Sequence, residues 1–170
     1  MPNLRIGFTV EGTRTLQRNL QLLGLEAVPA MGAGLLEEAE VIMTEAKVLV
    51  PVDQGELRAS GHVQGPEISG PNVSVAVGFG GAAAPYAVWV HEGIGPAVGR
   101  PPFFPPLEKI KAWVKRHGMD ESAAYPVARA IGQRGIPATK FLETPAKART
   151  AGMAGRLARF LKARYDRIVG

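Results

Sequence analysis

The chain is 170 residues long, a length that suits one domain with a well-filled core, and its hydrophobic and charged fractions, 46% and 21%, are those of an ordinary globular protein. It contains no cysteine, which excludes disulfides, thiolate metal sites and cysteine nucleophiles, and no apolar run approaches the roughly 20 residues that span a bilayer. The net charge of +5, with a pI near 9.8, permits a polyanionic partner such as DNA.

The N-terminal elements are predicted to be a strand and a short helix. In LRIGFTV, residues 4–10, apolar side chains alternate with others, which is the pattern of a half-buried strand. A signal peptide has a continuous apolar stretch instead, so we expect the protein to be made and used without crossing a membrane. Residues 12–24 carry leucines at helical spacing and end in Gly24, which predicts a short helix.

A long amphipathic helix is predicted from about Glu26 to Leu49, because its apolar residues recur at intervals of three and four. The acidic residues fall mostly outside this stripe, and they are Glu37, Glu38, Glu40 and Glu45. We therefore expect the outward face of this helix to be acidic.

The next stretch, VPVDQGELRAS over residues 50–60, places Asp53 and Glu56 three residues apart. Two neighbouring carboxylates can act as a general acid and base, but no histidine, lysine or metal-ligand spacing accompanies this pair. The residues from Asp53 to Gly55 are those of a tight turn. We interpret the stretch as a turn, with a strand that begins just after it at Leu57.

A hairpin, an ambiguous segment and a long loop are predicted next. The turn-rich residues 65–71 separate this strand from an alternating one at 73–79. The segment PYAVWVHEG, residues 85–93, fits the face of a strand or of a helix, and we favour the strand. Residues 93–106 have too many glycines and prolines for a regular element, and such long loops are commonly functional.

Two short helices and a basic terminal helix are predicted after the loop. LEKIKAWVKRHG is the first and ends at Gly118. DESAAYPVARAIGQRG is the second; it begins near Asp120 or restarts at Pro126, and it ends near Gly132 or Gly135. The terminal helix, over residues 144–168, is amphipathic and is predicted to break at a glycine, either Gly152 or Gly155.

The motifs of familiar enzymes and cofactor sites are incomplete in this chain. His91 and Glu92 form half of a zinc-protease helix, but the second histidine is replaced by Gly95. Gly93, Gly95 and Gly99 differ from a dinucleotide fingerprint, because the third glycine is one residue late and prolines replace the following helix. P-loop and G-x-S-x-G motifs are absent from the sequence. We expect no catalytic residues, metal or cofactor.

The basic C-terminal region is the main signal for a charged partner. Between Lys140 and Arg167 the only acidic residues are Glu143 and Asp166. We favour a solvated or subunit-facing surface over direct contact with phosphates, and few aromatic residues are present for stacking on bases. The acidic outward face of the long helix offers a further interpretation, in which basic and acidic faces meet head to tail and close a ring.

Three stretches, within roughly residues 46–148, resemble the neck or tail-completion proteins of tailed bacteriophages, of the lambdoid tail-component type. They are VPVDQGELRASGHV, AAAPYAVWVHEG and GIPATKFLETPAKA. The chain departs from the family pattern at His91, where a hydrophobic or acidic residue is expected, and the insert at 103–134 is longer than in the smallest members.

This resemblance implies an α+β fold, with a small twisted, mostly antiparallel sheet packed against a long helix and additional C-terminal helices. It implies no catalysis. We expect one domain over residues 1–170. It would consist of a sheet and long-helix core at 1–92, a Gly/Pro-rich loop at 93–106, a helical insert at 107–135 and a basic C-terminal helix at 136–170.

The resemblance also implies a structural role in the virion. The subunit would form a ring, six- or twelve-fold, that joins the DNA-filled head to the tail and leaves a channel for the genome. Its partners would be further copies of itself and the neighbouring head-closure and tail proteins, and non-specific contact with genomic DNA in the channel is allowed. Assembly would take place in the bacterial host cytoplasm, without a membrane.

Individual residues acquire expected roles from this resemblance. The residues expected to shape turns or anchor packing are Gly55, Leu57, Tyr86, Trp89, Gly93 and Phe141. Those expected at subunit or ring interfaces are His91, Glu92, Arg100, Phe103, Phe104, Arg156, Arg159 and Arg167. The alternative function is a DNA-binding accessory protein, which would use the basic helix around Arg156, Arg159, Lys162 and Arg167.

Overall fold

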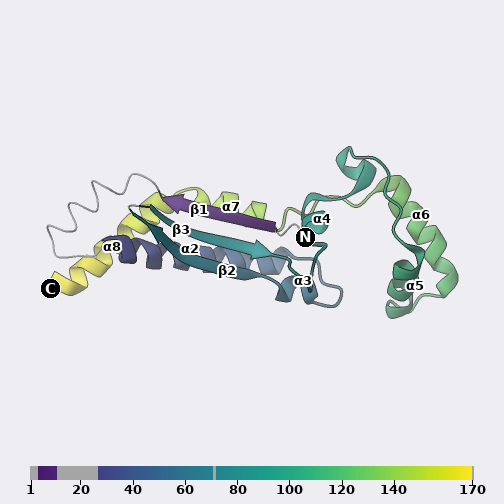
Figure 1. The fold of residues 1–170 in the computed structure, drawn as a ribbon, viewed down its shortest axis with the longest axis horizontal. Coiled ribbons are helices and arrows are strands. Elements are labelled where there is room, and N and C mark those ends of the chain that lie inside the picture. The colour runs from purple at the N-terminus through teal and green to yellow at the C-terminus, as the bar shows by residue number, and fades with distance from the viewer. Residues whose placement is uncertain (1–3, 11–26, 71, 170) are drawn as a thin grey trace. The chain divides into compact units, whose positions relative to one another are not determined.

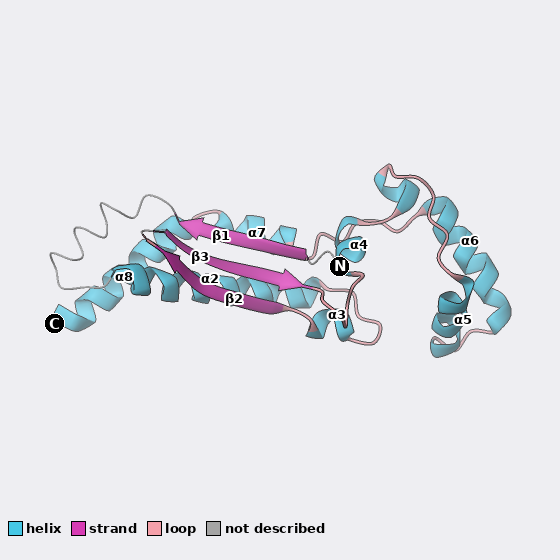
Figure 2. Ribbon diagram, viewed as in Figure 1, coloured by secondary structure: helices cyan, strands magenta, loops and turns pink. Residues whose placement is uncertain are grey.

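The computed structural model describes residues 4–10, 27–70 and 72–169. The fold is α+β, as predicted, with one antiparallel sheet, a long helix and further helices toward the C-terminus (Figure 2). The short helix predicted at 12–24 lies outside the described residues. None of the helices within the described ranges combines the length and apolar character needed to cross a membrane.

The chain divides into two compact units. The first comprises Met1–Pro85 with Phe141–Gly170, and the second comprises Tyr86–Lys140. The expected long loop and helical insert both fall within the second unit. The single domain that the sequence suggests stays a prediction.

The first unit contains the sheet, whose three strands are ordered β1-β3-β2 and are all antiparallel to their neighbours (Figure 1). Their bounds are β1 Leu4–Val10, β2 His62–Ser69 and β3 Asn72–Phe79. The strand predicted at 4–10 is therefore confirmed. Alternate residues of the central strand are fully buried, and they are Val73, Val75, Val77 and Phe79.

The long helix α2, Ala27–Leu49, lies along the sheet and contacts β2 and β3 (Figure 1). Its predicted apolar stripe is buried, and it includes Leu35, Ala39, Ile42, Met43 and Ala46. Each large side chain of this kind contributes about 1.5–3 kcal/mol when it is removed from water. The sheet and α2 therefore form the core of the first unit.

Two C-terminal helices complete the first unit and both contact α2. They are α7, Glu143–Thr150, and α8, Met153–Val169, so the predicted terminal helix is broken at Gly152, where φ is +75°. Before α7, Phe141 is fully buried and meets Phe79 edge to face, with ring centroids 5.0 Å apart. The aromatic pair gives Phe141 the packing position expected of it.

The prediction of a strand directly after the turn at 53–55 is wrong. Residues Glu56–Ala59 form a single helical turn, α3, and β2 begins at His62. Gly55 adopts a left-handed φ of +85° in front of α3, and its carbonyl accepts a 2.8 Å hydrogen bond from the Ala59 amide. Leu57 is buried, but Ala59 is exposed, so the apparent two-residue alternation was not a buried strand face.

The predicted hairpin is present, but its turn is shorter than expected. Most of the turn-rich stretch belongs to β2, which continues to Ser69, and Ser69 pairs with Asn72. The glycine and proline at 65–66 are accommodated by a register shift between Gln64 and Glu67. A bulge of this kind lets a strand contain residues that would otherwise interrupt it.

The second unit is helical. Its elements are α4 Ala87–Glu92, the 3₁₀ turn η1 Gly95–Val98, α5 Leu107–Arg116, the 3₁₀ turn η2 Glu121–Ala123 and α6 Ala124–Arg134. The two helices predicted after the loop are confirmed, and α6 ends at Arg134, directly before Gly135. Its small core is made of Ile110, Val114, Ala124 and Ala128, with Trp113, Ala123, Val127 and Ile131 packed around them.

The strand favoured for residues 85–93 is wrong, because this segment forms α4. Ala87 and His91, four residues apart, are its buried positions, and the Gly93 amide donates a 2.8 Å hydrogen bond to the Trp89 carbonyl at its end. The segment is apolar on several sides, so its pattern alone fitted both the period of a helix and the period of a strand.

Candidate assembly surfaces

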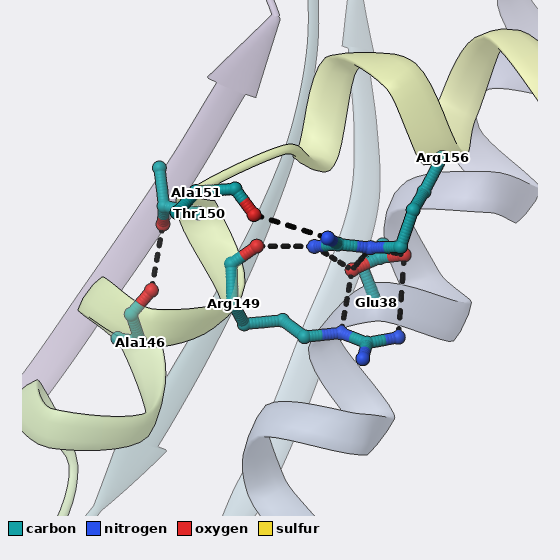
Figure 3. A network of polar contacts seen from close by, with 6 residues as sticks. All are labelled: Glu38, Ala146, Arg149, Thr150, Ala151 and Arg156. Carbon is teal, nitrogen blue, oxygen red and sulfur yellow. Dashed lines mark hydrogen bonds and ion pairs between the residues drawn. The ribbon is translucent and has the colours of Figure 1, made fainter.

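A buried ion-pair network connects α8 and α7 to the long helix (Figure 3). The Glu38 carboxylate, on α2, is 7% exposed and accepts hydrogen bonds from Arg149 Nε at 2.8 Å and from Arg156 Nε and Nη2 at 2.9 Å each. Arg156 also donates to the carbonyl oxygens of Arg149 and Ala151. Arg156 therefore joins the end of α7, the following turn and α2.

The electrostatics of this network are those of one carboxylate between two cations. The hydrogen bond from Arg156 lowers the pKa of Glu38, with a further lowering from Arg149, although burial acts in the opposite direction. The same bond raises the pKa of Arg156. Glu38 is thus held ionised and the two arginines are both charged.

This network changes two expectations from the sequence. Glu38 was expected on an exposed acidic face, but it is buried, and Arg156 was expected to face a subunit or DNA, but its charge is directed at Glu38. The spacing offered a signal: Glu38 lies three residues after Leu35 and four before Ile42, on the same stripe as these core residues. Arg149, its other partner, had not been singled out.

The exposed cations of α8 lie beyond this network. Met153, Leu157 and Leu161 are buried, while Arg159, Arg164 and Arg167 are exposed. Lys162 is exposed too, but it forms a 2.7 Å ion pair with Asp166. The basic surface of α8 therefore consists mainly of three arginines.

In the second unit, the structure brings together parts of two of the family-like stretches. The amide and carbonyl groups of Ile94 and Ile136 exchange two hydrogen bonds, at 2.9 and 2.8 Å. The Thr139 hydroxyl donates to the Val90 carbonyl at 2.8 Å, and the Lys140 amide donates to the His91 carbonyl at 3.1 Å. We call this set of contacts the strand-bridge junction.

Close backbone packing at the strand-bridge junction explains its glycines. Gly93 has a φ of +76°, and a Cβ there would lie 2.7 Å from the Ile136 carbonyl oxygen and the Ala138 nitrogen. Lys140 adopts a φ of +50°, unusual for a residue with a side chain, and its Nζ lies 2.6 Å from Glu92 Oε2. The shaping role expected of Gly93 thus has a steric basis.

The residues expected at interfaces are placed unequally by the structure. His91 is only 2% exposed, so in this conformation it offers little surface to a neighbouring subunit, and Glu92 is paired with Lys140. Arg100 is exposed. Of the two residues near them that were expected to anchor packing, Tyr86 is partly buried, but Trp89 is 53% exposed.

Exposed apolar side chains gather on the second unit. A groove is lined by Phe104, Pro105, Leu107, Tyr125, Ala128, Arg129 and Gln133, and we call it the aromatic groove. Phe104 is 59% exposed and Tyr125 65%, and Phe103, beside Phe104 in the chain, is 44% exposed. The Phe104 ring rests against Gly132 of α6, where a Cβ would lie 2.2 Å from the ring carbons.

A second exposed apolar surface lies at the end of α2 in the first unit. Val48, Leu49 and Val52 are 73%, 48% and 60% exposed. Glu45, also exposed, precedes Val48 and Leu49 by three and four residues, so these three side chains are neighbours on the helix. We call these four residues the α2-end patch. The sequence had not indicated this patch as an interaction surface, nor had it indicated Leu107 and Tyr125 of the aromatic groove.

Comparison with protein-family models, with curated proteins and with solved structures finds no match.

Proposed function

We propose that this chain is a structural subunit of a tailed-bacteriophage neck, which forms a ring that joins the DNA-filled head to the tail and leaves a channel for the genome. The three stretches that resemble neck and tail-completion proteins support the choice of this assembly. In this role the chain is located in the virion and acts without catalysis.

The observation that carries the proposal is the aromatic groove. Large aromatic side chains as exposed as Phe104 and Tyr125 are costly to leave in water, and contiguous apolar surface on a soluble protein commonly marks an interaction site. The groove contains a single charged residue, Arg129, and its remaining lining is mainly apolar. A subunit that is completed by neighbours accounts for this surface, and an enzyme pocket with convergent titratable groups would be lined differently.

Deletion of the gene from its phage is expected to leave filled heads and separate, unattached tails in the lysate, as seen by electron microscopy. Supplying the wild-type gene in trans should restore joined particles and infectivity. Normal joined, infectious particles in the deletion lysate would contradict the neck role.

A second candidate function, DNA binding through α8, is favoured by the three exposed arginines. No ion pair is seen for Arg159, Arg164 or Arg167 among the described residues. Phosphate contacts of this kind would give an affinity for duplex DNA that falls steeply with salt, by roughly one power of the salt concentration for each phosphate neutralised.

Replacing Arg159, Arg164 and Arg167 by glutamine tests this second function without disturbing Glu38. If α8 binds DNA, the plot of log affinity against log salt concentration should become shallower by about three in the triple variant. Fluorescence anisotropy with duplex DNA measures this slope. The matched control replaces three exposed cations of the second unit, Lys109, Lys115 and Arg134, with glutamine. Equal DNA affinity and salt slope in the two variants would exclude α8 as the DNA-binding surface.

A further inference from the structure

We propose that the α2-end patch of one subunit docks into the aromatic groove of a second copy of this chain, as the repeating contact of an oligomer. This inference rests on the proposed function in that it identifies the contact by which ring subunits would join. It concerns two surfaces that lie on different units of the chain, each fully defined within its own unit.

Apolar complementarity is the first argument for this contact. Val48 and Leu49 of the α2-end patch lie in the last turn of a helix, and both side chains are about half exposed or more. The patch therefore protrudes from the helix surface. The aromatic groove is concave and is lined by two aromatic rings, a leucine and a proline. A helix face inserted into an apolar groove is a recurring mode of protein recognition.

Charge complementarity selects a second copy as the occupant. The second unit carries eight lysines and arginines against four aspartates and glutamates, a net charge of +4, and Arg129 lines the groove itself. The exposed acidic residues of α2 are Glu37, Glu40 and Glu45, the last of which belongs to the α2-end patch. Among the described residues neither Arg129 nor Glu45 forms an ion pair, so the two charges are available to each other.

The buried network removes two cations from those that could meet the acidic helix, because Arg149 of α7 and Arg156 of α8 are already bonded to Glu38 within the chain. The exposed arginines of α8 offer charge, but the second unit combines its cations with the apolar surface of the aromatic groove. The α2-end patch, which is itself both apolar and acidic, matches that combination.

A contact between two different surfaces of the same chain is heterologous, so each subunit can bind one neighbour through the patch and another through the groove. Repetition of such a contact gives a ring when the rotation closes and an open chain when it does not. A second copy is thus the one partner that this contact needs, and the rotation between neighbouring subunits decides whether the oligomer closes into a ring.

The absence of cysteine from the chain allows a direct test by disulfide cross-linking. Leu49→Cys and Tyr125→Cys are made in separate full-length chains, both at exposed positions, and the purified proteins are mixed and oxidised. We expect about tenfold more covalent dimer than from a control mixture of Ser69→Cys with Tyr125→Cys, because a disulfide needs Cα atoms within about 7 Å. Equal yields from the two mixtures would overturn the proposed contact, as would capture of the groove by another virion protein with no dimer of this chain.

The charges provide a second readout. Adding Arg129→Glu to the Tyr125→Cys chain, or Glu45→Arg to the Leu49→Cys chain, should each lower the dimer yield about two- to fivefold, and combining the two should restore it. Lys115→Glu removes the same charge outside the groove and is the matched control. An equal loss with Lys115→Glu, or no restoration in the combined pair, would contradict the assigned contact.

Failure of this contact and failure of the neck role have different signatures. If cross-linking fails while the deletion phage accumulates unattached heads and tails, the contact is wrong and the neck role stands. If cross-linking succeeds while the deletion phage assembles normally, the chain self-associates through these surfaces but does not join heads to tails.

Discussion

Replacing Gly135 by alanine is expected to lower the free energy of unfolding of the second unit by about 3 kcal/mol, because the new side chain has no space and the backbone is unsuited to it. Gly135 has a φ of +78°, and a Cβ there would lie 2.2 Å from the Ile94 carbonyl oxygen and 2.7 Å from the Ala97 nitrogen. The Ile94 carbonyl accepts one of the two hydrogen bonds of the strand-bridge junction. The backbone at Ile94 would have to shift to make room for the new Cβ, and this backbone is hydrogen-bonded to Ile136 in the strand-bridge junction.

Gly99→Ala is the matched control for this substitution. Gly99 also has a left-handed φ, +69°, but nothing lies within 4 Å of the position that a Cβ would take there, so only the conformational cost of about 1 kcal/mol is expected. Native-state hydrogen exchange of amides in α5 and α6 measures both effects in the full chain. Equal protection in the two variants would show that the close approach at Gly135 does not limit the stability of this unit.

Elements with long, regular patterns were predicted well from the sequence. The α2 stripe extends over several turns, and the alternation in β1 and β3 covers whole strands, so periodicity alone was sufficient. Glycines narrowed the end of α6 to Gly132 or Gly135 and the break before α8 to Gly152 or Gly155, since the left-handed conformation that stops a helix favours glycine. The structure selects Gly135 and Gly152, which have φ of +78° and +75°.

The elements that were predicted wrongly are short. α3 has four residues and α4 six, too few for a helical period to be distinguished from an alternating one. The carbonyls of Val90 and His91, near the end of α4, also accept hydrogen bonds from residues about 50 positions later in the chain, Thr139 and Lys140. A local pattern holds no information about such partners.

The charged network was missed because its partners are more than 100 residues apart. The sequence showed Glu38 among other acidic residues and Arg156 among other basic ones, which favours two separate charged faces. Only the packing of α7 and α8 against α2 brings Arg149 and Arg156 to the same carboxylate. The aromatic groove was missed for a related reason: Phe104 and Tyr125 belong to different segments, and only Phe104 was expected at an interface.

Replacing Glu38 by glutamine is expected to lower the free energy of unfolding of the full chain by about 2 kcal/mol. Breaking a fully buried ion pair costs about 3–5 kcal/mol, and we expect less here because the side chains of Arg149 and Arg156 are 30% and 25% exposed, which lets water stabilise the charges left behind. Glu37→Gln, an exposed carboxylate at the adjacent position, should change stability by less than about 0.5 kcal/mol. Urea unfolding of the two variants and the wild type measures the difference, and a loss in Glu38→Gln no larger than in Glu37→Gln would exclude a stabilising role for the network.

Acid provides an independent check on the origin of this stability. The hydrogen bond from Arg156, followed by the effect of Arg149, holds the folded-state pKa of Glu38 below its ordinary value of 4.5. A carboxyl with a lowered folded pKa binds fewer protons when folded than when unfolded, so its contribution is fully present above about pH 4.5 and is lost as the pH falls through the folded pKa. The arginines stay charged throughout this range. The difference in the free energy of unfolding between wild type and Glu38→Gln should therefore be constant near neutral pH and shrink below pH 4.5, because protonated Glu38 and glutamine are both neutral. A difference that stays the same at lower pH would mean that the variant is destabilised by altered packing and not by loss of the charge.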